Sequence, residues 1–142
     1  MGSVLSIDYG KKRIGLAVSD PRRIFAFPCG VIENKNINHV IFSIKEIIDQ
    51  KEIDLIIIGM PYHMNSGKGL EQPRGEMEKI VQGFVKKLKE TINIPINIVD
   101  ERLSSFAANE NLKERGVSAK KSKELIDEEA ARLLLEEFIR NN

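Results

Sequence analysis

The chain has 142 residues, 42% of them hydrophobic and 30% charged, and its formal net charge is only +1; this predicts one globular domain over 1–142 and excludes disordered, collagen-like and low-complexity classes. A single cysteine, Cys29, and two histidines exclude an intramolecular disulfide and a four-ligand structural zinc site, so we expect a reducing, cytoplasmic environment. No apolar run approaches about 18 residues, so no membrane partner is expected.

Short apolar segments separated by polar turns open the chain. Residues 4–8, 13–19 and 24–31 predict three strands, and the short connections between them indicate an antiparallel meander. The period then changes, and apolar residues on one helical face predict an amphipathic helix over 37–50. Residues 54–59 are apolar without alternation, which is typical of a central strand covered on both faces.

The second half of the chain alternates helices with one more strand. Residues 62–75 are rich in glycine and predict a loop, followed by a helix over 77–88 and a strand over 96–100. Helices over 104–115 and 119–140 complete the order β-β-β-α-β-α-β-α-α. This order predicts an α/β fold with a five-stranded mixed sheet, a three-strand antiparallel meander plus two parallel strands, flanked by helices.

Acidic residues far apart in the sequence are expected to meet beyond the carboxyl ends of the strands. Asp8 ends the first strand, and Asp100 and Glu101 end the fifth. In sheets built with crossover helices, functional groups gather at these ends. The strand ends therefore supply two of the acidic positions that we expect in a site.

The third acidic position comes from the last helix. Its apolar stripe consists of Ile126, Ala130, Leu133, Leu134 and Phe138. At about 100° per residue, Asp127 falls inside this stripe, whereas Glu128, Glu129 and Glu136 fall outside it. A buried carboxylate is costly unless it is paired or bound to a cation, so Asp127 is expected either to bind a metal ion or to pair with a nearby Lys or Arg. Ala130 and Ala131 are small enough to let the helix approach the sheet.

Such oxygen ligands suit Mg²⁺ or Mn²⁺, and two ions about 4 Å apart can activate a water molecule and stabilise the leaving oxygen in phosphodiester cleavage. Structural interpretations stay open, because Asp8 could form a strand-end turn and Glu101 could form an ion pair with Arg102. Basic residues flank the acids and are either phosphate-binding groups or ordinary solvated side chains. They are Lys11, Lys12, Arg13, Arg102, Lys120, Lys121 and Lys123.

Four segments together resemble the YqgF family, also called RuvX. They are IDYGKKRIGLAVSD (7–20), IIIGMP (56–61), IVDERLSS (98–105) and LIDEEAARLLLEEF (125–138). Members of this family are known as Holliday junction resolvase-like proteins and are now regarded as nucleases of precursor 16S rRNA. The segment after Pro61 departs from the family pattern, so substrate contacts by this loop are not carried over.

The resemblance implies a ribonuclease H-like fold and divalent-metal phosphodiesterase chemistry with Mg²⁺ or Mn²⁺. It places the catalytic, metal-binding acids at Asp8, Glu101 and Asp127, with Asp100 as the reserve for the second position. It also implies a nuclease acting on structured nucleic acid, with the 5′ end of precursor 16S rRNA as substrate and ribosomal particles as further partners. A Holliday junction resolvase acting on branched DNA is the alternative. The chain is expected to be a monomer or a weak homodimer.

Two other function classes remain open from the sequence. Asp-x-Gly followed by a basic residue also resembles the first phosphate loop of actin-like and sugar-kinase proteins, although those enclose nucleotide between two such domains. A non-catalytic RNA- or protein-binding module could use the same basic residues without metal. Aromatic residues make up only 6% of the chain and Trp is absent, so no base-stacking platform is predicted.

Overall fold

The computed structural model describes residues 2–61, 75–100 and 119–141, with the backbone alone for 119–125. Five strands and three helices lie in these described ranges. They are β1 (Ser3–Tyr9), β2 (Arg13–Ser19), β3 (Ala26–Glu33), α1 (Ile37–Lys51), β4 (Ile53–Met60), α2 (Glu76–Thr91), β5 (Ile96–Asp100) and α4 (Ala119–Arg140). The predicted helix over 104–115 and residues 62–74 of the predicted loop lie outside the described residues. No helix among the described residues is long and apolar enough to cross a membrane.

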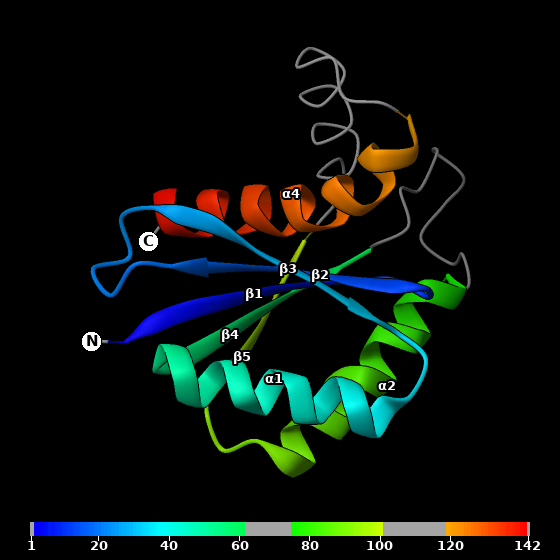
Figure 1. Cartoon of the computed structure of the whole chain (residues 1–142). Helices are drawn as coiled ribbons and strands as arrows, with labels where there is room; N and C mark the ends of the chain where they lie inside the picture. The colour runs from blue at the N-terminus through cyan, green and yellow to red at the C-terminus, as the bar shows by residue number, and fades with distance from the viewer. Residues whose placement is uncertain (1, 62–74, 101–118, 142) are drawn as a thin grey trace, which may run out of the picture.

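The strands form one mixed sheet in the order β3-β2-β1-β4-β5. β1 pairs antiparallel with β2, and β2 antiparallel with β3, while β4 runs parallel to both β1 and β5. The predicted meander, the two parallel strands and the central position of β4 are therefore confirmed. β1, β4 and β5 direct their carboxyl ends toward the same edge of the molecule (Figure 1).

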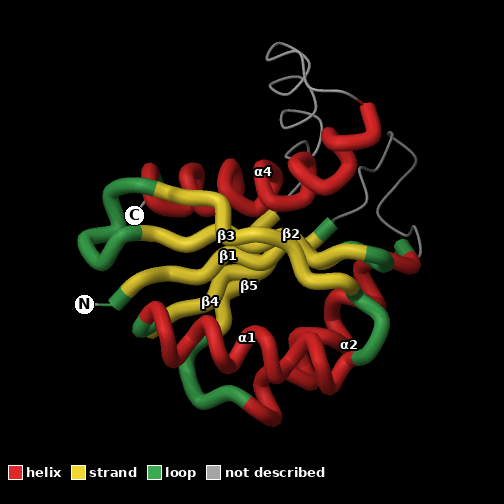
Figure 2. The backbone as a smooth tube through the Cα atoms, viewed as in Figure 1, coloured by secondary structure: helices red, strands yellow, loops and turns green. Residues whose placement is uncertain are grey.

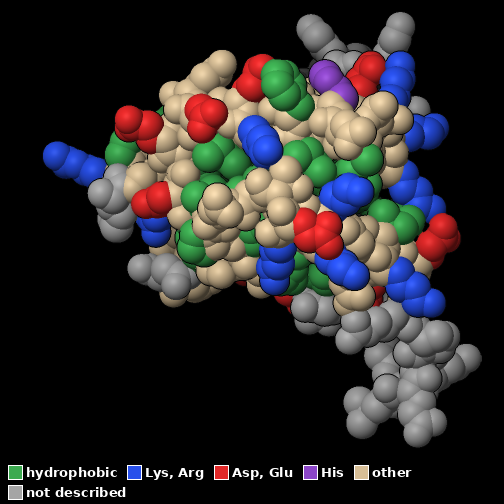
Figure 3. Space-filling view, turned by 90° about the horizontal axis from the view of Figure 1, so that it is seen from below, with side chains coloured by type: hydrophobic (Ala, Val, Ile, Leu, Met, Phe, Trp, Pro, Cys, Tyr) green, Lys and Arg blue, Asp and Glu red, His purple; other side chains and the backbone are tan. Residues whose placement is uncertain are grey.

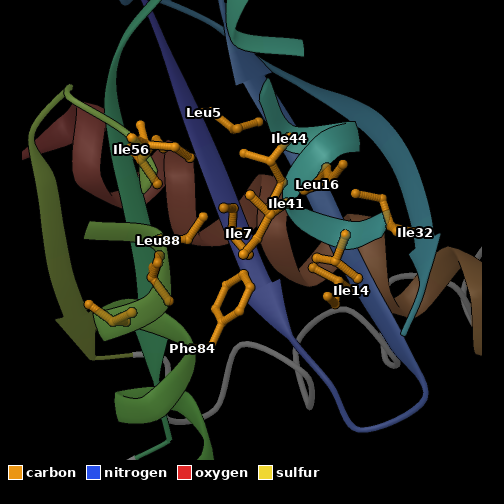
Figure 4. Close-up of a cluster of buried hydrophobic side chains, with 14 of the residues drawn as sticks. Leu5, Ile7, Ile14, Leu16, Ile32, Ile41, Ile44, Ile56, Phe84 and Leu88 are labelled. Carbon is orange, nitrogen blue, oxygen red and sulfur yellow. The ribbon is translucent and has the colours of Figure 1, made fainter. Parts of the chain in front are cut away.

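Helices cover both faces of this sheet. α1 and α2 lie against one face and α4 lies against the other (Figure 2). The larger core fills the α1/α2 side, where Leu5 and Ile7 of β1 point toward Ile44 of α1 and Phe84 and Leu88 of α2 (Figure 4). The period of two in β1 sends Val4 to the opposite face, where it packs with residues of α4.

The prediction for the third strand was shifted by two residues. Ile24 and Phe25 are not in the strand, and β3 continues to Glu33. The reason is the turn before it, in which the Asp20 carboxylate accepts hydrogen bonds from the backbone N–H groups of Ile24 and Phe25 at 2.8 and 2.7 Å. Arg23 adopts the left-handed conformation in this turn, with φ of 56°. The turn chemistry therefore overrides the apolar pattern of the segment.

A polar cluster fastens the start of β1 to β4. Asp54 accepts a hydrogen bond from the backbone N–H of Gly2 at 2.7 Å and pairs with the guanidinium of Arg23. These contacts, the Gly2 amide first, hold the pKa of Asp54 below its usual value. Arg23 also donates from Nε to the carbonyl oxygen of Gly2 at 3.2 Å. The β2–β3 turn, β1 and β4 are thus joined at the end of the sheet where β1 begins.

The buried face of α4 differs in part from the predicted stripe. Ala130, Ala131, Leu134 and Leu135 are buried, whereas Leu133 is only half-buried. Glu129, predicted to lie outside the stripe, is 9% exposed. Its carboxylate accepts hydrogen bonds from the guanidinium of Arg132, which also donates to Glu136. The reason for the error is that a neighbouring arginine on the same helix makes the burial of this carboxylate possible.

Glu128 of α4 contacts β3, which is an edge strand of the sheet. Gly30 has a φ of +86°, and its backbone N–H donates to the Glu128 carboxylate at 3.0 Å. The pairing of β2 with β3 is irregular between Gly15 and Ala17, and Gly30 lies at this irregularity. Positive φ values favour glycine because it has no Cβ. The bulge and the helix are therefore held together by a side chain of α4.

Candidate active site

Asp8 lies near the carboxyl end of β1, on the face that α4 covers. Alternation along β1 places Val4, Ser6 and Asp8 on this face, and Val4 packs with Ala131 of α4. The Ser6 hydroxyl donates a hydrogen bond of 2.8 Å to the carbonyl oxygen of Ala131. Asp8 is half-buried. The next residue of β1 after Ser6 on the side of α4 is therefore an acid, Asp8. It lies opposite α4 about one helical turn from Ala131.

Gly15 brings the Asp127 backbone onto the sheet beside Asp8. Asp8 and Gly15 are cross-strand partners in the β1–β2 pairing. A Cβ placed on Gly15 would lie 1.9 Å from the Asp127 carbonyl oxygen and 2.9 Å from the backbone nitrogen of Glu128. Two residues along a strand span about 6.7 Å and one helical turn spans about 5.4 Å, so the step from Ser6 to Asp8 matches the step from Ala131 to Asp127. The predicted approach of Asp127 to the strand end is thus found in the structure.

Asp127 is also paired with an arginine, the second of the two expectations drawn from its place in the apolar stripe. Arg13 Nε donates to Asp127 Oδ2 at 2.7 Å, and the two side chains are 33% and 22% exposed. Arg13 begins β2 and shares its face with Gly15 and Ala17. Partial burial shields this ion pair from water and strengthens it relative to a surface pair. The site therefore contains two carboxylates and one guanidinium at the start of β2.

The second predicted acidic position is described only in part. Glu101 lies outside the described residues. Asp100, its reserve, is exposed at the end of β5 opposite Met60. It lines a cavity of about 330 Å³ together with Val99, residues of the last two turns of α4 from Leu134 onward, and Asn141 just after the helix. Asp100 thus lies beside the carboxyl-terminal part of α4, at least about two turns away from Asp127.

Three of the seven predicted phosphate-binding residues have described side chains. Lys11 and Lys12 are exposed in the turn between β1 and β2, and Lys11 is 3.4 Å from Glu76 of α2. Asn34 holds this turn by donating to the Gly10 carbonyl oxygen and by its backbone hydrogen bond to Lys12. On the α1/α2 face, Lys and Arg side chains gather toward the edge where β1 ends in Figure 1 (Figure 3).

The remaining four basic residues cannot be placed in the same way. Lys120, Lys121 and Lys123 lie in the first two turns of α4, with only their backbone described. Arg102 lies outside the described residues. Of the seven predicted residues, those with described side chains at this edge are therefore Lys11, Lys12 and the partly buried Arg13.

The donor set around Asp8 and Asp127 fits a divalent ion such as Mg²⁺. Mg²⁺ is commonly held by one or two carboxylates, with water and substrate phosphates completing its shell. Asp8 and Asp127, which belong to neighbouring backbone segments at Gly15, are the carboxylates that could meet this requirement. Across the described part of the chain, no group of three or more His, Cys, Asp and Glu side chains is arranged to hold a metal. A complete triad therefore depends on Glu101.

Two residues that were not predicted from the sequence, Gly15 and Ser6, position the site. Gly15 lets α4 approach the sheet, and Ser6 binds the helix backbone one turn from Asp127. The sequence carries a signal for both, since small residues at 6, 15 and 17 interrupt strands made otherwise of large apolar residues. Such positions commonly mark a close approach of another backbone.

Comparison with known proteins places the chain in a family. The family model described as "RuvX: Holliday junction resolvase" matches residues 2–141. The chain belongs to the RuvX family. Relatives named as candidate pre-16S rRNA nucleases include one from Maridesulfovibrio salexigens, 40% identical over 136 residues, and one from Clostridium acetobutylicum, 38% identical over the same length. Each alignment covers 96% of this chain and 96% of the relative.

Solved structures of this fold include proteins in complex with Holliday junctions. RuvC of Thermus thermophilus, in complex with a Holliday junction substrate, aligns with a TM-score of 0.59 at 15% identity and covers 99% of this RuvX chain and 95% of RuvC. The Fowlpox virus resolvase bound to Holliday junction DNA aligns with a TM-score of 0.54 at 13% identity, covering 98% and 97% of the two chains. The predicted ribonuclease H-like fold is confirmed.

Proposed function

We propose that this RuvX chain is a divalent-metal-dependent nuclease that hydrolyses phosphodiester bonds of structured RNA, with the 5′ end of precursor 16S rRNA as its substrate in the cytoplasm. The observation that carries the proposal is that Gly15 is the cross-strand partner of Asp8 and that the Asp127 backbone packs against the same Gly15. The names of relatives at 40% and 38% identity support RNA as the substrate.

Asp8 and Asp127 would hold Mg²⁺ or Mn²⁺, with Glu101 as third ligand and Asp100 as its reserve. When bound, the metal supplies an activated water molecule and stabilises the leaving oxygen of the cleaved bond. The chain's own contribution is to keep the carboxylates in place. Asp8 is fixed by the β1–β2 pairing, and Asp127 is fixed because its backbone packs directly on Gly15.

Basic side chains around the acids would bind the nucleic-acid backbone. Lys11 and Lys12 are exposed beside the carboxyl end of β1, and Arg102, Lys120, Lys121 and Lys123 are close to Glu101 or Asp127 along the sequence. Contacts of Lys and Arg with phosphates release counterions, so such binding weakens with salt. A monomer or weak homodimer acting on ribosomal particles would bind the nucleic acid at this end of the strands.

Branched DNA is the second candidate substrate. The description of the family as a Holliday junction resolvase favours it. The two candidates share the same carboxylate chemistry and differ in the shape of the nucleic acid, which the described residues do not discriminate. A direct comparison of substrates is therefore the deciding experiment.

The test is cleavage by the purified full chain in Mg²⁺, with precursor 16S rRNA fragments, single-stranded RNA and four-way DNA junctions as substrates. Asp8→Asn and Asp127→Asn each keep the shape of the side chain and remove a charged oxygen donor. We expect each to reduce cleavage at least about 100-fold, an increase in barrier of about 2.7 kcal/mol. Asp49→Asn is the matched control, because Asp49 is exposed on α1, which covers the opposite face of the sheet.

Three outcomes separate the hypotheses. Preferred cleavage of precursor rRNA that stops in EDTA supports the proposal, and Zn²⁺ should replace Mg²⁺ poorly because hard oxygen ligands suit hard ions. Preferred cleavage of junctions selects the resolvase alternative. Binding of RNA without cleavage, unchanged in Asp8→Asn, would indicate a non-catalytic binding module instead.

A further inference from the structure

Arg13 already occupies the side of Asp127 where a cation would bind. Its Nε lies 2.7 Å from Asp127 Oδ2, inside ordinary hydrogen-bond distance. A carboxylate oxygen in this contact is directed at the guanidinium. Arg13 and a metal ion therefore compete for the same carboxylate.

The two partners differ in how freely they can move. The Asp127 backbone is fixed by its packing on Gly15, and the Arg13 backbone is fixed by pairing with Glu33 of β3. The side chain of Arg13, in contrast, has a long flexible stem and is 33% exposed. Rotation about the bonds of this stem can move the guanidinium relative to Asp127 while the backbones of β2 and α4 stay in place.

Charge decides when each arrangement is stable. With no metal ion present, the partly buried Asp127 carboxylate is stabilised by the guanidinium that neutralises it. With a divalent cation present, the guanidinium meets a charge of its own sign, and the repulsion is strong in a partly buried site. The arrangement therefore favours Arg13 in the absence of metal and the ion in its presence.

We infer that Arg13 is an exchangeable counterion of the metal site: it neutralises Asp127 while the site lacks metal and is displaced when a divalent ion binds. The inference rests on the proposed metal-binding function of Asp8 and Asp127. Arg13 acts on the reaction through Asp127 and is a positioning residue in this role. Once displaced, its guanidinium could contact a phosphate of the substrate.

The test is titration of Mn²⁺ alone into the full chain, followed by calorimetry. We expect Arg13→Gln to bind Mn²⁺ about 10-fold more tightly than the parent chain, which corresponds to about 1.4 kcal/mol. The same variant should melt at a lower temperature in EDTA, and this difference should shrink in saturating Mn²⁺. Arg13→Lys keeps the positive charge and should bind Mn²⁺ within about threefold of the parent.

Lys12→Gln is the matched control, since it removes one positive charge from an exposed neighbouring residue. An equal gain in Mn²⁺ affinity in Lys12→Gln, or unchanged or weaker Mn²⁺ binding in Arg13→Gln, overturns the inference. If the parent chain fails to bind Mn²⁺, or if Asp8→Asn and Asp127→Asn bind Mn²⁺ as tightly as the parent, the metal site of the proposed function fails, and the inference fails with it.

A measurement on the parent chain keeps the test independent of whether the variants fold. The NMR signal of the Arg13 Nε–H, assigned by its loss in Arg13→Lys or by sequential assignment, reports the bond to Asp127. Saturation with Mg²⁺ should shift this signal and speed its exchange with water. A signal that stays unchanged while Mg²⁺ binds shows that Arg13 remains on Asp127 and overturns the inference.

Discussion

Replacement of Gly15 by alanine tests the contact that brings the two acids together. The added Cβ would lie 1.9 Å from the Asp127 carbonyl oxygen and 2.3 Å from its carbonyl carbon. Both are backbone atoms, so no side chain can rotate to make room. An ordinary contact begins near 3.4 Å, and α4 must therefore move by about 1.5 Å at Asp127, or the strand must bend by as much.

This displacement should reduce both stability and cleavage. Overpacking of this kind costs about 1–3 kcal/mol, and at about 3 °C per kcal/mol for a chain of this size the melting temperature should fall by about 3–10 °C. A misplacement of about 1 Å in a catalytic group can cost about 100-fold in rate. Urea denaturation gives the free energy of unfolding, and cleavage of precursor rRNA is measured well below the melting temperature.

Gly83→Ala provides the control with the same chemical change. Gly83 is exposed within α2, and a Cβ there would meet no atom within 4 Å. Alanine favours the helix over glycine by about 1 kcal/mol, so this variant should be more stable than the parent chain and equally active. If Gly15→Ala matched Gly83→Ala in stability and cleavage, the close packing of α4 on β2 would be wrong, and with it the argument that joins Asp127 to Asp8.

Three further outcomes can be measured. The pKa of Asp54 is lowered in the folded chain, so the stabilising effect of its carboxylate is present above the unfolded pKa of about 3.9 and is lost as the pH falls through the folded pKa. In pH-dependent thermal melts, Asp54→Asn should therefore lose less stability than the parent chain between pH 5 and pH 2. An identical dependence of stability on pH in both proteins would contradict this role of Asp54. Arg132→Met leaves the 9% exposed Glu129 without its guanidinium, and we expect a loss of about 1–3 kcal/mol in urea denaturation, whereas a loss below about 0.5 kcal/mol would show that water replaces the pair. Combined Lys120→Gln and Lys121→Gln should lower the log-log salt slope of RNA binding by about 1 to 2; an unchanged slope places these lysines away from the substrate.

Most of the fold was predictable because buried faces of strands and helices require apolar residues at regular spacings in the sequence. The fully apolar segment of β4 and the spaced apolar residues of α1 gave their type and approximate bounds. The start of β3 was not predictable from the spacing of apolar residues. Asp20 sets it by accepting hydrogen bonds from the backbone N–H groups of Ile24 and Phe25, which do not depend on side-chain type. The apolar side chains of Ile24 and Phe25 gave no sign that their amides were already engaged.

The sequence identified Asp127 as a candidate site residue, but it did not identify the residue with which Asp127 pairs. The helical wheel identified Asp127 because an acid within an apolar stripe is unusual, and it failed for Glu129 because Arg132 follows three residues later on the same helix. Selecting Arg13 as the partner of Asp127 required the register of β2 against β1, which depends on contacts distant in sequence. Glu101 remains a prediction.

The irregular edge strand β3 also bears on how copies of this chain behave at high concentration. An open sheet edge can recruit another strand if it offers a regular row of amide donors and carbonyl acceptors. Pro28 has no amide hydrogen to offer, and the amide of Gly30 is already bound by Glu128. A strand arriving from a second copy would find this ladder interrupted at two positions two residues apart. The same helix carboxylate that binds the Gly30 amide therefore also reduces what β3 can offer to an arriving strand.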